Sequence, residues 1–304
     1  MKIISFISFV FYIIFSKLMS FVPFKILYIL SDMMYPIVYW VIRYRRKVVR
    51  YNLTSSFPNK SKSEIIAIEK KYYRHLCDIT LESFKTNMPK KTMKKRYKVL
   101  NRDKVNNHIA ETNKSILVLV HHYNNWEWGT TSAGFQFDYP GVIVYHKISN
   151  FWIDKNMKKS RSKRGTIMVP TEETSRTFKQ YVDKQHMFYL VADQYPTAIR
   201  FSYWEEFLGK ETSWFSGPEI YSRKYNIPTY ILSIKKVKRG YYELYYKKVS
   251  DSPKDLPKQE ITRLYVEELE KLIMEEPAYW IWSHKRWKSM PDNKGSYFNP
   301  YDKL

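Results

Sequence analysis

The sequence is poor in glycine and cysteine, and each shortage excludes a class of chemistry. It has 8 glycines in 304 residues and contains no G-x-G-x-x-G or G-x-x-x-x-G-K-[ST] string. Nucleotide chemistry that relies on glycine-rich phosphate loops is therefore not expected. Cys77 is the single cysteine, which rules out an internal disulfide, a cysteine-rich zinc site and a CxxC redox pair. This suits a reducing compartment, with Cys77 as a small buried apolar residue.

Acidic residues are also few compared with basic ones. Lys and Arg together number 52 and Asp and Glu 29, which gives a formal net charge of +23. Such an excess needs a negative partner: nucleic acid, an anionic membrane surface, or a phosphorylated or acidic substrate. Because 44% of the residues are hydrophobic and 17% are aromatic, the chain has ample material for a buried core. Its length fits one large domain or two small ones.

The N-terminus is the most apolar part of the chain. Residues 3–24 are apolar or small except for Lys17, and a second apolar stretch covers residues 33–42. A membrane span needs about 20 apolar residues, so residues 3–24 are just long enough to cross a bilayer and equally able to lie flat on one. The segment lacks the small-residue cleavage site of a signal peptide, and we expect it to be retained.

A basic cluster follows this segment directly. Clusters of this kind lie on the cytoplasmic side of a membrane and bind anionic lipid; its members are Arg43, Arg45, Arg46, Lys47 and Arg50. We therefore expect residues 1–42 to be membrane-associated hydrophobic helices and residues 43–304 to be a domain in the cytoplasm. The alternative is that the apolar segment is a hairpin of buried core helices.

Beyond the N-terminus, short apolar runs alternate with helical patterns. Residues 115–120 are rich in branched side chains and predict a central strand covered on both faces. Further strands are predicted at residues 141–145, 166–169 and 187–192, and an antiparallel hairpin at 229–236 and 241–248. Helices are predicted over residues 62–85, where Ser61 and Glu64 have capping-box spacing, and over 258–274. We expect an α/β fold with a mainly parallel central sheet flanked by helices, preceded by the N-terminal helical membrane-associated element.

A histidine and a carboxylate follow the first predicted strand. His122 and Glu127 lie in the string HHYNNWEW, at the carboxyl end of a strand, where open α/β sheets bind substrates. Glu127, in the first turn of the next helix, would accept a hydrogen bond from one imidazole nitrogen and leave the other as a base for a substrate hydroxyl or amine. From spacing alone a structural histidine is the commoner outcome, and the adjacent His121 leaves the identity of the base open. A catalytic zinc ion usually takes three protein ligands. Only His121, His122 and Glu127 are clustered here, and adjacent histidines at a strand end point to opposite sides, so no metal is expected.

The same string resembles the motif of a known family. His122-x4-Glu127 is similar to the H-x4-(D/E) motif of membrane-associated glycerolipid and lipid A acyltransferases, and its H-x-x-N-W-E context is similar to the lipid A biosynthesis (lauroyl/myristoyl) acyltransferases. Four more blocks occur in that family's order: Tyr44-Arg45-Arg46 leading to Asn52-Leu53 and Phe57-Pro58; Ala192-Asp193-Gln194; Phe207-Leu208-Gly209 with Thr212 and Gly217; and PAYWIWSHKRWK from Pro277 to Lys288. The resemblance covers about residues 35–288.

The resemblance implies a reaction as well as a fold. It implies transfer of a fatty acyl group from an acyl thioester, usually on acyl carrier protein, to a hydroxyl of a phosphorylated lipid A precursor at the cytoplasmic face of the inner membrane. His122 would be the general base and Glu127 would orient it. Neither a covalent acyl-enzyme nor a cofactor is implied.

Further residues are substrate-binding candidates through the same resemblance. Asn125 belongs to the motif itself, and Arg161 and Arg164 correspond to an arginine-rich segment whose guanidinium groups suit phosphate; a solvated basic loop is the alternative. Asp193 follows another predicted strand and is expected to contact the acceptor or hold a loop, unless it caps a helix. Gly209 matches an aromatic-x-Gly element that allows close backbone approach to substrate, unless it forms an ordinary turn.

Two other functions fit parts of the sequence. A nucleic-acid-binding protein would account for the charge and the aromatic residues, but it leaves the apolar N-terminus unexplained, so no nucleic acid is expected as a partner. An acyltransferase for another glycolipid or an amino lipid would use the same histidine and glutamate.

Overall fold

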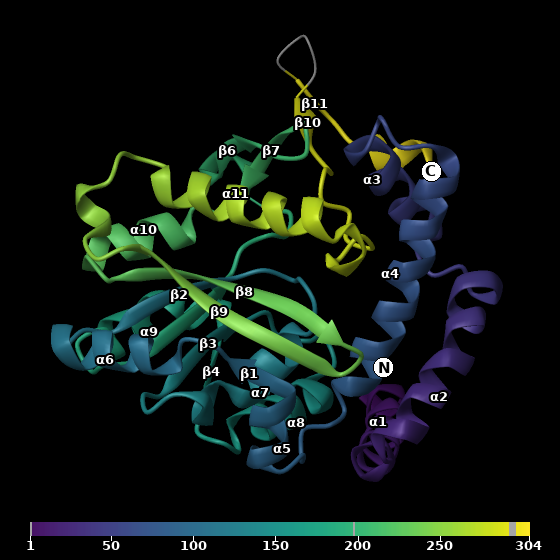
Figure 1. Ribbon diagram of the computed structural model, residues 1–304, viewed down its shortest axis with the longest axis horizontal. Coiled ribbons are helices and arrows are strands. Elements are labelled where there is room, and N and C mark those ends of the chain that lie inside the picture. Colours follow the sequence, from purple (N-terminus) through teal and green to yellow (C-terminus); the bar gives the residue numbers. More distant parts are fainter. Residues whose placement is uncertain (1, 197, 292–295) are drawn as a thin grey trace.

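A seven-stranded sheet forms the centre of the molecule (Figure 1). The computed structural model describes residues 2–196, 198–291 and 296–304. The strand order is β1-β9-β8-β2-β5-β3-β4, with β1 at Tyr97–Val99, β2 at Ile116–Val120, β3 at Gly141–Tyr145, β4 at Ile167–Pro170, β5 at Met187–Val191, β8 at Thr229–Lys238 and β9 at Tyr241–Ser250. All neighbouring pairs are parallel except the β8–β9 hairpin. The predicted α/β fold with a mainly parallel sheet is confirmed.

Helices and short hairpins complete the domain. The helices after the N-terminal segment are α3 (Arg46–Ser56), α4 (Lys62–Glu82), α5 (Lys90–Arg96), α6 (Arg102–Thr112), α7 (Trp126–Gln136), α8 (Phe151–Ser162), α9 (Thr174–Tyr181), α10 (Gly217–Tyr225) and α11 (Glu260–Glu275). Short 3₁₀ turns lie at Thr171–Glu173, Ile199–Phe201, Pro253–Asp255, Pro277–Tyr279 and Pro300–Lys303. Two small antiparallel pairs are β6 (Tyr203–Glu206) with β7 (Glu211–Trp214) and β10 (Met290–Pro291) with β11 (Tyr297–Phe298).

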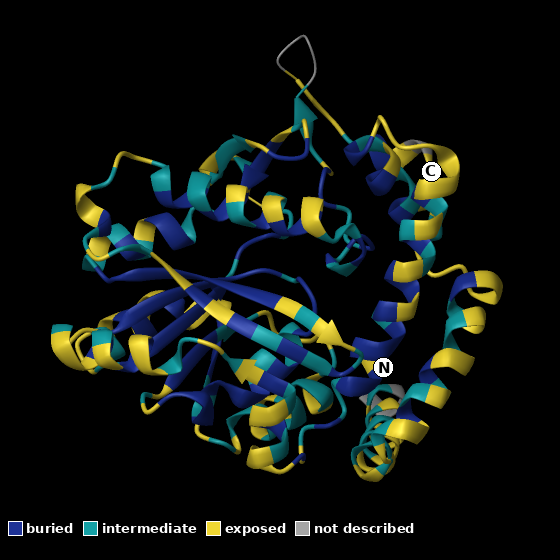
Figure 2. Cartoon of the chain, viewed as in Figure 1, coloured by how far each residue is buried: buried dark blue, intermediate teal, exposed yellow. Residues whose placement is uncertain are grey.

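The central strand β2 is buried along its whole length, as its apolar run predicts. Its side chains alternate between the two faces of the sheet. Leu117 and Leu119 belong to a core shared with α9, α11 and the tryptophans near the C-terminus. Ile116, Val118 and Val120 pack with α5, α6 and α7 on the other face. Figure 2 shows the sheet as the most deeply buried part of the chain.

The N-terminal segment is broken into α1 (Lys2–Phe21), α2 (Phe24–Pro36) and a π-helix at Ile37–Val41. Pro23 precedes the first residue of α2 and has no backbone N–H to continue α1. Taken singly, no helix among the described residues is long and apolar enough to cross a membrane; only Phe24–Val41 and Arg46–Ser56 together, bent by 87°, meet the length and composition requirements.

Lys85 holds the break between α1 and α2. The capping box of Ser61 and Glu64 starts α4 as predicted, but the helix ends at Glu82 instead of continuing to Lys85. The Lys85 ammonium, on a side chain that is almost fully buried, donates to the carbonyl oxygens of Ser20 (3.1 Å) and Val22. In Figure 1, α4 stands between the sheet and α2, and α1 lies at its lower end.

The turn of the β8–β9 hairpin connects α2 to α4 and to the central sheet. The Arg239 guanidinium lies 2.7 Å from an Asp32 carboxylate oxygen on α2 and 2.6 Å from one of Asp78 on α4. Gly240 follows in the left-handed region, with φ of 73°. A Cβ at this position would lie 1.8 Å from the Tyr28 hydroxyl oxygen. The predicted turn therefore needs its glycine both for φ and for the passage of Tyr28.

We predict that Arg239→Ala destabilises the protein. Asp78 is buried and would keep the Ser31 hydroxyl at 2.7 Å and the Lys236 ammonium at 3.6 Å but lose its guanidinium partner, so we expect a loss of about 1–2 kcal/mol in the free energy of unfolding. Thermal unfolding of the purified protein in detergent measures this as a lower Tm. Arg263→Ala is the matched control, because Arg263 also pairs with two carboxylates, Glu260 and Glu267, but on an exposed helix face. An equal change in Tm for the two variants would contradict the prediction.

Candidate active site

The candidate site is built at the carboxyl end of β2. The strand ends at Val120, and a tight loop leads to α7. In this loop Asn124 takes a left-handed conformation, with φ of 56°, and its side chain donates to the Ile234 carbonyl. Asn125 then caps α7 by accepting from the Trp128 N–H at 3.0 Å. The loop therefore fixes where α7 begins and where the side chains on either side of it point.

His122 is held by Asp193, from the end of the neighbouring strand β5. The imidazole Nδ1 lies 2.6 Å from Asp193 Oδ1, and the His122 backbone N–H donates to Oδ2 at 2.8 Å. The Trp280 indole N–H donates to the same Oδ2 at 2.9 Å. Asp193 is fully buried. Because Nδ1 faces a carboxylate, it carries the proton, and Nε2 is left as the basic nitrogen.

The electrostatics of this pair favour an ionised Asp193. Burial alone would raise the pKa of Asp193, but the charge and hydrogen bond of His122 hold it well below its usual range. For His122, burial lowers the pKa, but the charge and hydrogen bond of Asp193, with the charge of Glu127, raise it above its ordinary value. The Gln194 side-chain amide lies 3.4 Å from Nε2. His122 is thus oriented and made more basic by the protein around it.

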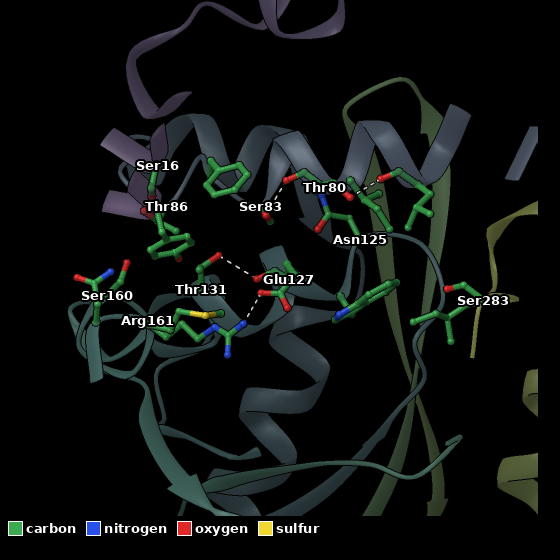
Figure 3. Close-up of a pocket in the computed structure, with 18 of the residues that line it drawn as sticks. Ser16, Thr80, Ser83, Thr86, Asn125, Glu127, Thr131, Ser160, Arg161 and Ser283 are labelled. Carbon is green, nitrogen blue, oxygen red and sulfur yellow. Dashed lines mark hydrogen bonds and ion pairs between the residues drawn. The ribbon is translucent and has the colours of Figure 1, made fainter. Parts of the chain in front are cut away.

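Glu127 does not make the hydrogen bond to His122 that its spacing predicts. Its carboxylate instead forms an ion pair with Arg161 of α8, with 2.6 Å between Oε2 and Nη2 (Figure 3). The reason is geometric: Asp193 already occupies Nδ1, and the first turn of α7 directs Glu127 toward α8. The predicted histidine–glutamate pair is replaced by two separate pairs, His122–Asp193 and Glu127–Arg161.

A cavity of about 320 Å³ lies against the Glu127–Arg161 pair. It is enclosed by α4, α7, α8, α1 and the chain around residues 281–283; Figure 3 shows Ser16, Thr80, Ser83, Ser160 and Arg161 around it. Leu76, Ile79, Phe84 and Met157 add apolar surface. Trp126 lines the cavity, and its ring centroid lies 5.2 Å from that of the His122 imidazole. The cavity therefore borders the Glu127–Arg161 pair directly, and Trp126 connects it to His122, which is not among the lining residues.

The two predicted phosphate-binding arginines have different surroundings. Arg161 lines the cavity, whereas the Arg164 guanidinium donates to the Met88 carbonyl and lies 5.3 Å from the Phe135 ring. Arg164 therefore holds backbone and aromatic surface. Gly209 has φ of 70° in the turn that joins β6 to β7 and does not line this cavity. Its place matches the ordinary-turn alternative.

The adjacent His121 faces the other way. Its ring stacks on Tyr265 with 4.3 Å between centroids, and burial lowers its pKa to about 4. Cys77 is buried on α4 as predicted, which raises the pKa of its thiol to about 12. Over the part of the chain that the structure describes, no three His, Cys, Asp or Glu side chains are grouped to hold a metal ion. The expectation that the reaction uses no metal stays a prediction.

Some contacts within the site were not found by sequence reasoning, although Asp193, Glu127 and Arg161 were themselves candidates. The link between Asp193 and His122 spans 71 positions, so the spacing of a motif could not reveal it; the Ala-Asp-Gln block at the end of a predicted strand was its only signal. The ion pair of Glu127 with Arg161 likewise joins separate helices. Trp126 lies within the motif string, but nothing in its pattern indicates that it contacts His122.

With this geometry in view, comparison with known families is decisive. The sequence model of the bacterial lipid A biosynthesis acyltransferases matches residues 2–289, nearly the whole chain. The chain belongs to this family. A comparison with individually curated proteins finds no match. Family membership makes the protein an acyltransferase of the lipid A type, in agreement with the resemblance read from its motifs.

We predict that Asp193→Asn lowers activity and shifts its pH dependence. A base acts in its neutral form, so kcat/KM falls as the pH drops below the pKa of His122. Because this pKa is raised, the fall, which is the acid limb of the profile, begins at a higher pH than for an ordinary histidine. Removing the Asp193 charge lowers that pKa, and the limb moves to lower pH. We also expect a loss of about 10²–10⁴-fold in kcat, because the tautomer is no longer fixed. Rates measured from pH 5 to 9 test both effects.

Asp138→Asn is the control for this experiment. Asp138 pairs with Arg102 and Asn106, away from the cavity, so its amide variant should keep the wild-type profile. Full activity of Asp193→Asn with an unmoved acid limb would show that Asp193 does not act on His122.

Proposed function

We propose that this lipid A-type acyltransferase moves a fatty acyl chain from an acyl thioester, with acyl carrier protein as the donor, to a hydroxyl of a phosphorylated lipid A precursor. The observation that carries the proposal is the buried Asp193 carboxylate on Nδ1 of His122, which leaves Nε2 as the basic nitrogen. Trp126 contacts the His122 ring and lines the partly apolar cavity. The family supports acyl transfer in lipid A biosynthesis; the donor, acceptor and catalytic residues are part of the proposal.

The chemistry follows from the tautomer of His122. Nε2 takes the proton of the acceptor hydroxyl while that oxygen attacks the thioester carbonyl, and a C–O bond forms. The tetrahedral intermediate then collapses, the C–S bond breaks, and the imidazolium returns the proton to the leaving thiolate. Asp193 stabilises the imidazolium between these steps. The enzyme carries no acyl group at any stage.

The second pair supplies charge next to the reaction. Arg161 presents a guanidinium on the cavity side of Glu127, and guanidinium groups bind phosphate through two parallel hydrogen bonds. We assign the acceptor phosphate to Arg161 in preference to Arg164, since Arg164 is engaged with Met88. Glu127 then orients Arg161 and raises the basicity of His122 through space. The apolar side chains of α4 and α8 would receive the start of the acyl chain.

Lipid A from cells provides the direct test. A strain that lacks the gene should lose one acyl mass from its lipid A, and the wild-type gene should restore it. His122→Ala and Glu127→Ala should fail to restore it although they are folded and membrane-bound, with losses of about 10²–10⁴-fold in vitro. His121→Ala should lose much less, because its ring stacks on Tyr265 and makes no hydrogen bond to Asp193.

Two outcomes would overturn parts of this proposal. An inactive His121 variant beside an active His122 variant would move the base to the other histidine. An unchanged lipid A mass spectrum, with an acyl mass lost from another lipid, would favour the second candidate acceptor, a different glycolipid or an amino lipid. The site does not discriminate against such an acceptor, because the base acts on any nucleophile placed at Nε2.

We further propose that residues 1–42 associate with the inner membrane and that residues 43–304 form the catalytic domain on its cytoplasmic face. The family is generally membrane-associated. Helix α1 exposes Phe11, Leu18 and Phe21 at 69%, 60% and 76%, and an apolar face this continuous fits a lipid surface. Beside it, Trp152 of α8 contacts Phe6 and is also partly exposed.

Charged substitutions on that face test the membrane proposal. The triple variant Phe11→Glu, Leu18→Glu and Phe21→Glu should shift the protein toward the soluble fraction, because it places charge on the surface that meets lipid. Ile220→Glu is the control, since Ile220 is 48% exposed on α10, far from α1 in the fold (Figure 1). Unchanged sedimentation of the triple variant with membranes in high salt would count against α1 as the anchor.

A further inference from the structure

Glu82, the last residue of α4, is a buried carboxylate outside the two polar pairs of the site. It is fully buried, and among the described residues it pairs with no Lys or Arg. Burial raises its pKa to about 7, although hydrogen bonds from Tyr28 and Tyr242 act to lower it. An apolar side chain of similar size would fill the same space without this cost. The position therefore needs an explanation other than packing.

Three donors from three elements converge on this carboxylate. The Tyr28 hydroxyl of α2 donates to Oε1 at 2.7 Å. The Asn125 side-chain amide donates to Oε2 at 2.6 Å, and the Tyr242 hydroxyl of β9 donates to the same oxygen at 2.8 Å. The backbone carbonyl of Glu82 accepts from the Trp128 indole N–H at 2.8 Å. Glu82 thus joins α2 and β9 to the loop that carries His122.

The contact with Asn125 decides how α7 begins. A carboxylate only accepts hydrogen bonds, so Glu82 forces the NH₂ of Asn125 toward itself. The amide oxygen of Asn125 must then face the helix, where it accepts from the Trp128 N–H. Figure 3 shows Asn125 beside α4, with Glu127 below it. The Trp128 N–H and the Glu82 carboxylate therefore select the same orientation of the cap, one through the amide oxygen and the other through the NH₂ group.

We propose that Glu82 is a positioning residue of the acyltransferase: through Asn125 it sets the first turn of α7, and through Tyr28 it links that turn to α2. This inference rests on the proposed function. Glu82 does not touch substrate. It places the loop between His122 and Glu127, and it makes that placement depend on how α2 is seated against the body.

The link to α2 is itself constrained by close packing. Tyr28 reaches Glu82 by passing over Gly240, where a side chain would collide with its hydroxyl. Arg239 lies over the Tyr28 ring at 4.6 Å and pairs with Asp32 four residues further along α2. The position of α2 and the orientation of Asn125 therefore both depend on the contacts of Tyr28, which lies between Arg239 and Glu82.

The test compares kcat and KM for three variants in detergent. Glu82→Leu should lower kcat by about 10–100-fold, because a small misplacement of catalytic groups costs this much, while KM for the acyl donor stays within about twofold. Glu82→Gln should retain most of kcat, since its amide oxygen still accepts from Asn125 while its NH₂ donates to the Tyr28 oxygen. Tyr28→Phe should lower kcat several-fold, because it cuts only the link to α2.

Glu219→Gln is the matched control. Glu219 is also fully buried and accepts from the backbone N–H groups of Gln259 and Thr262, next to α11. Its amide variant should lower Tm without changing kcat of the folded enzyme. A Glu82→Leu variant with wild-type kcat would overturn the proposal, as would equal kcat losses in Glu82→Leu and Glu219→Gln. If Glu82→Leu does not fold, a wild-type kcat for Tyr28→Phe overturns the link to α2.

The same assay separates this inference from the proposed function. An inactive His122→Ala together with an unaffected Glu82→Leu refutes the positioning role alone. An active His122→Ala refutes the proposed mechanism, and the role of Glu82 within it, together.

Discussion

Parallel pairing of β2 with β5 sets Val120 opposite Val191, so both strands end at the same edge of the sheet and deliver His122 and Asp193 two residues later. A shift of one residue would send one of the two side chains to the opposite face. The buried Asp193 carboxylate would then lose His122, and a buried charge without its partner is costly. The hydrophobic strands of the sheet thus select the partner of the base.

More of the fold than of the site could be predicted from the sequence. The apolar run ending at Val120, the Lys238-Arg239-Gly240 turn and the Ser61–Glu64 capping box are local signals, and each element they predicted is present. Strand β1 has only three residues and pairs with β9, which is distant in the sequence. No local pattern therefore predicted it. The ion pairs of the site could not be predicted for the same reason, because their partners lie on distant elements. Glu127 is five positions from His122, yet the helix turns it toward α8, and the true partner of His122 comes from another strand.

The two faces of the N-terminal helices have opposite characters. Toward the body, α2 is fastened by polar groups, with Asp32 on Arg239 and Ser31 on Asp78. Away from it, α1 and α2 have many exposed residues (Figure 2), and the exposed side chains are mostly apolar. Polar contacts have defined directions, whereas apolar contacts with a fluid surface do not. The orientation of α2 is therefore determined by the body.

The break between α1 and α2 raises the question of which groups pair with its free backbone carbonyls. The last turn of any helix leaves carbonyl groups without partners on the helix itself, and water normally solvates them. In a hydrocarbon environment no water is present to do so, and each bare carbonyl is strongly penalised. The Lys85 ammonium donates hydrogen bonds to the carbonyl oxygens of Ser20 and Val22. Two of the carbonyls at the kink therefore have a hydrogen-bond donor from the protein itself and do not depend on water for one.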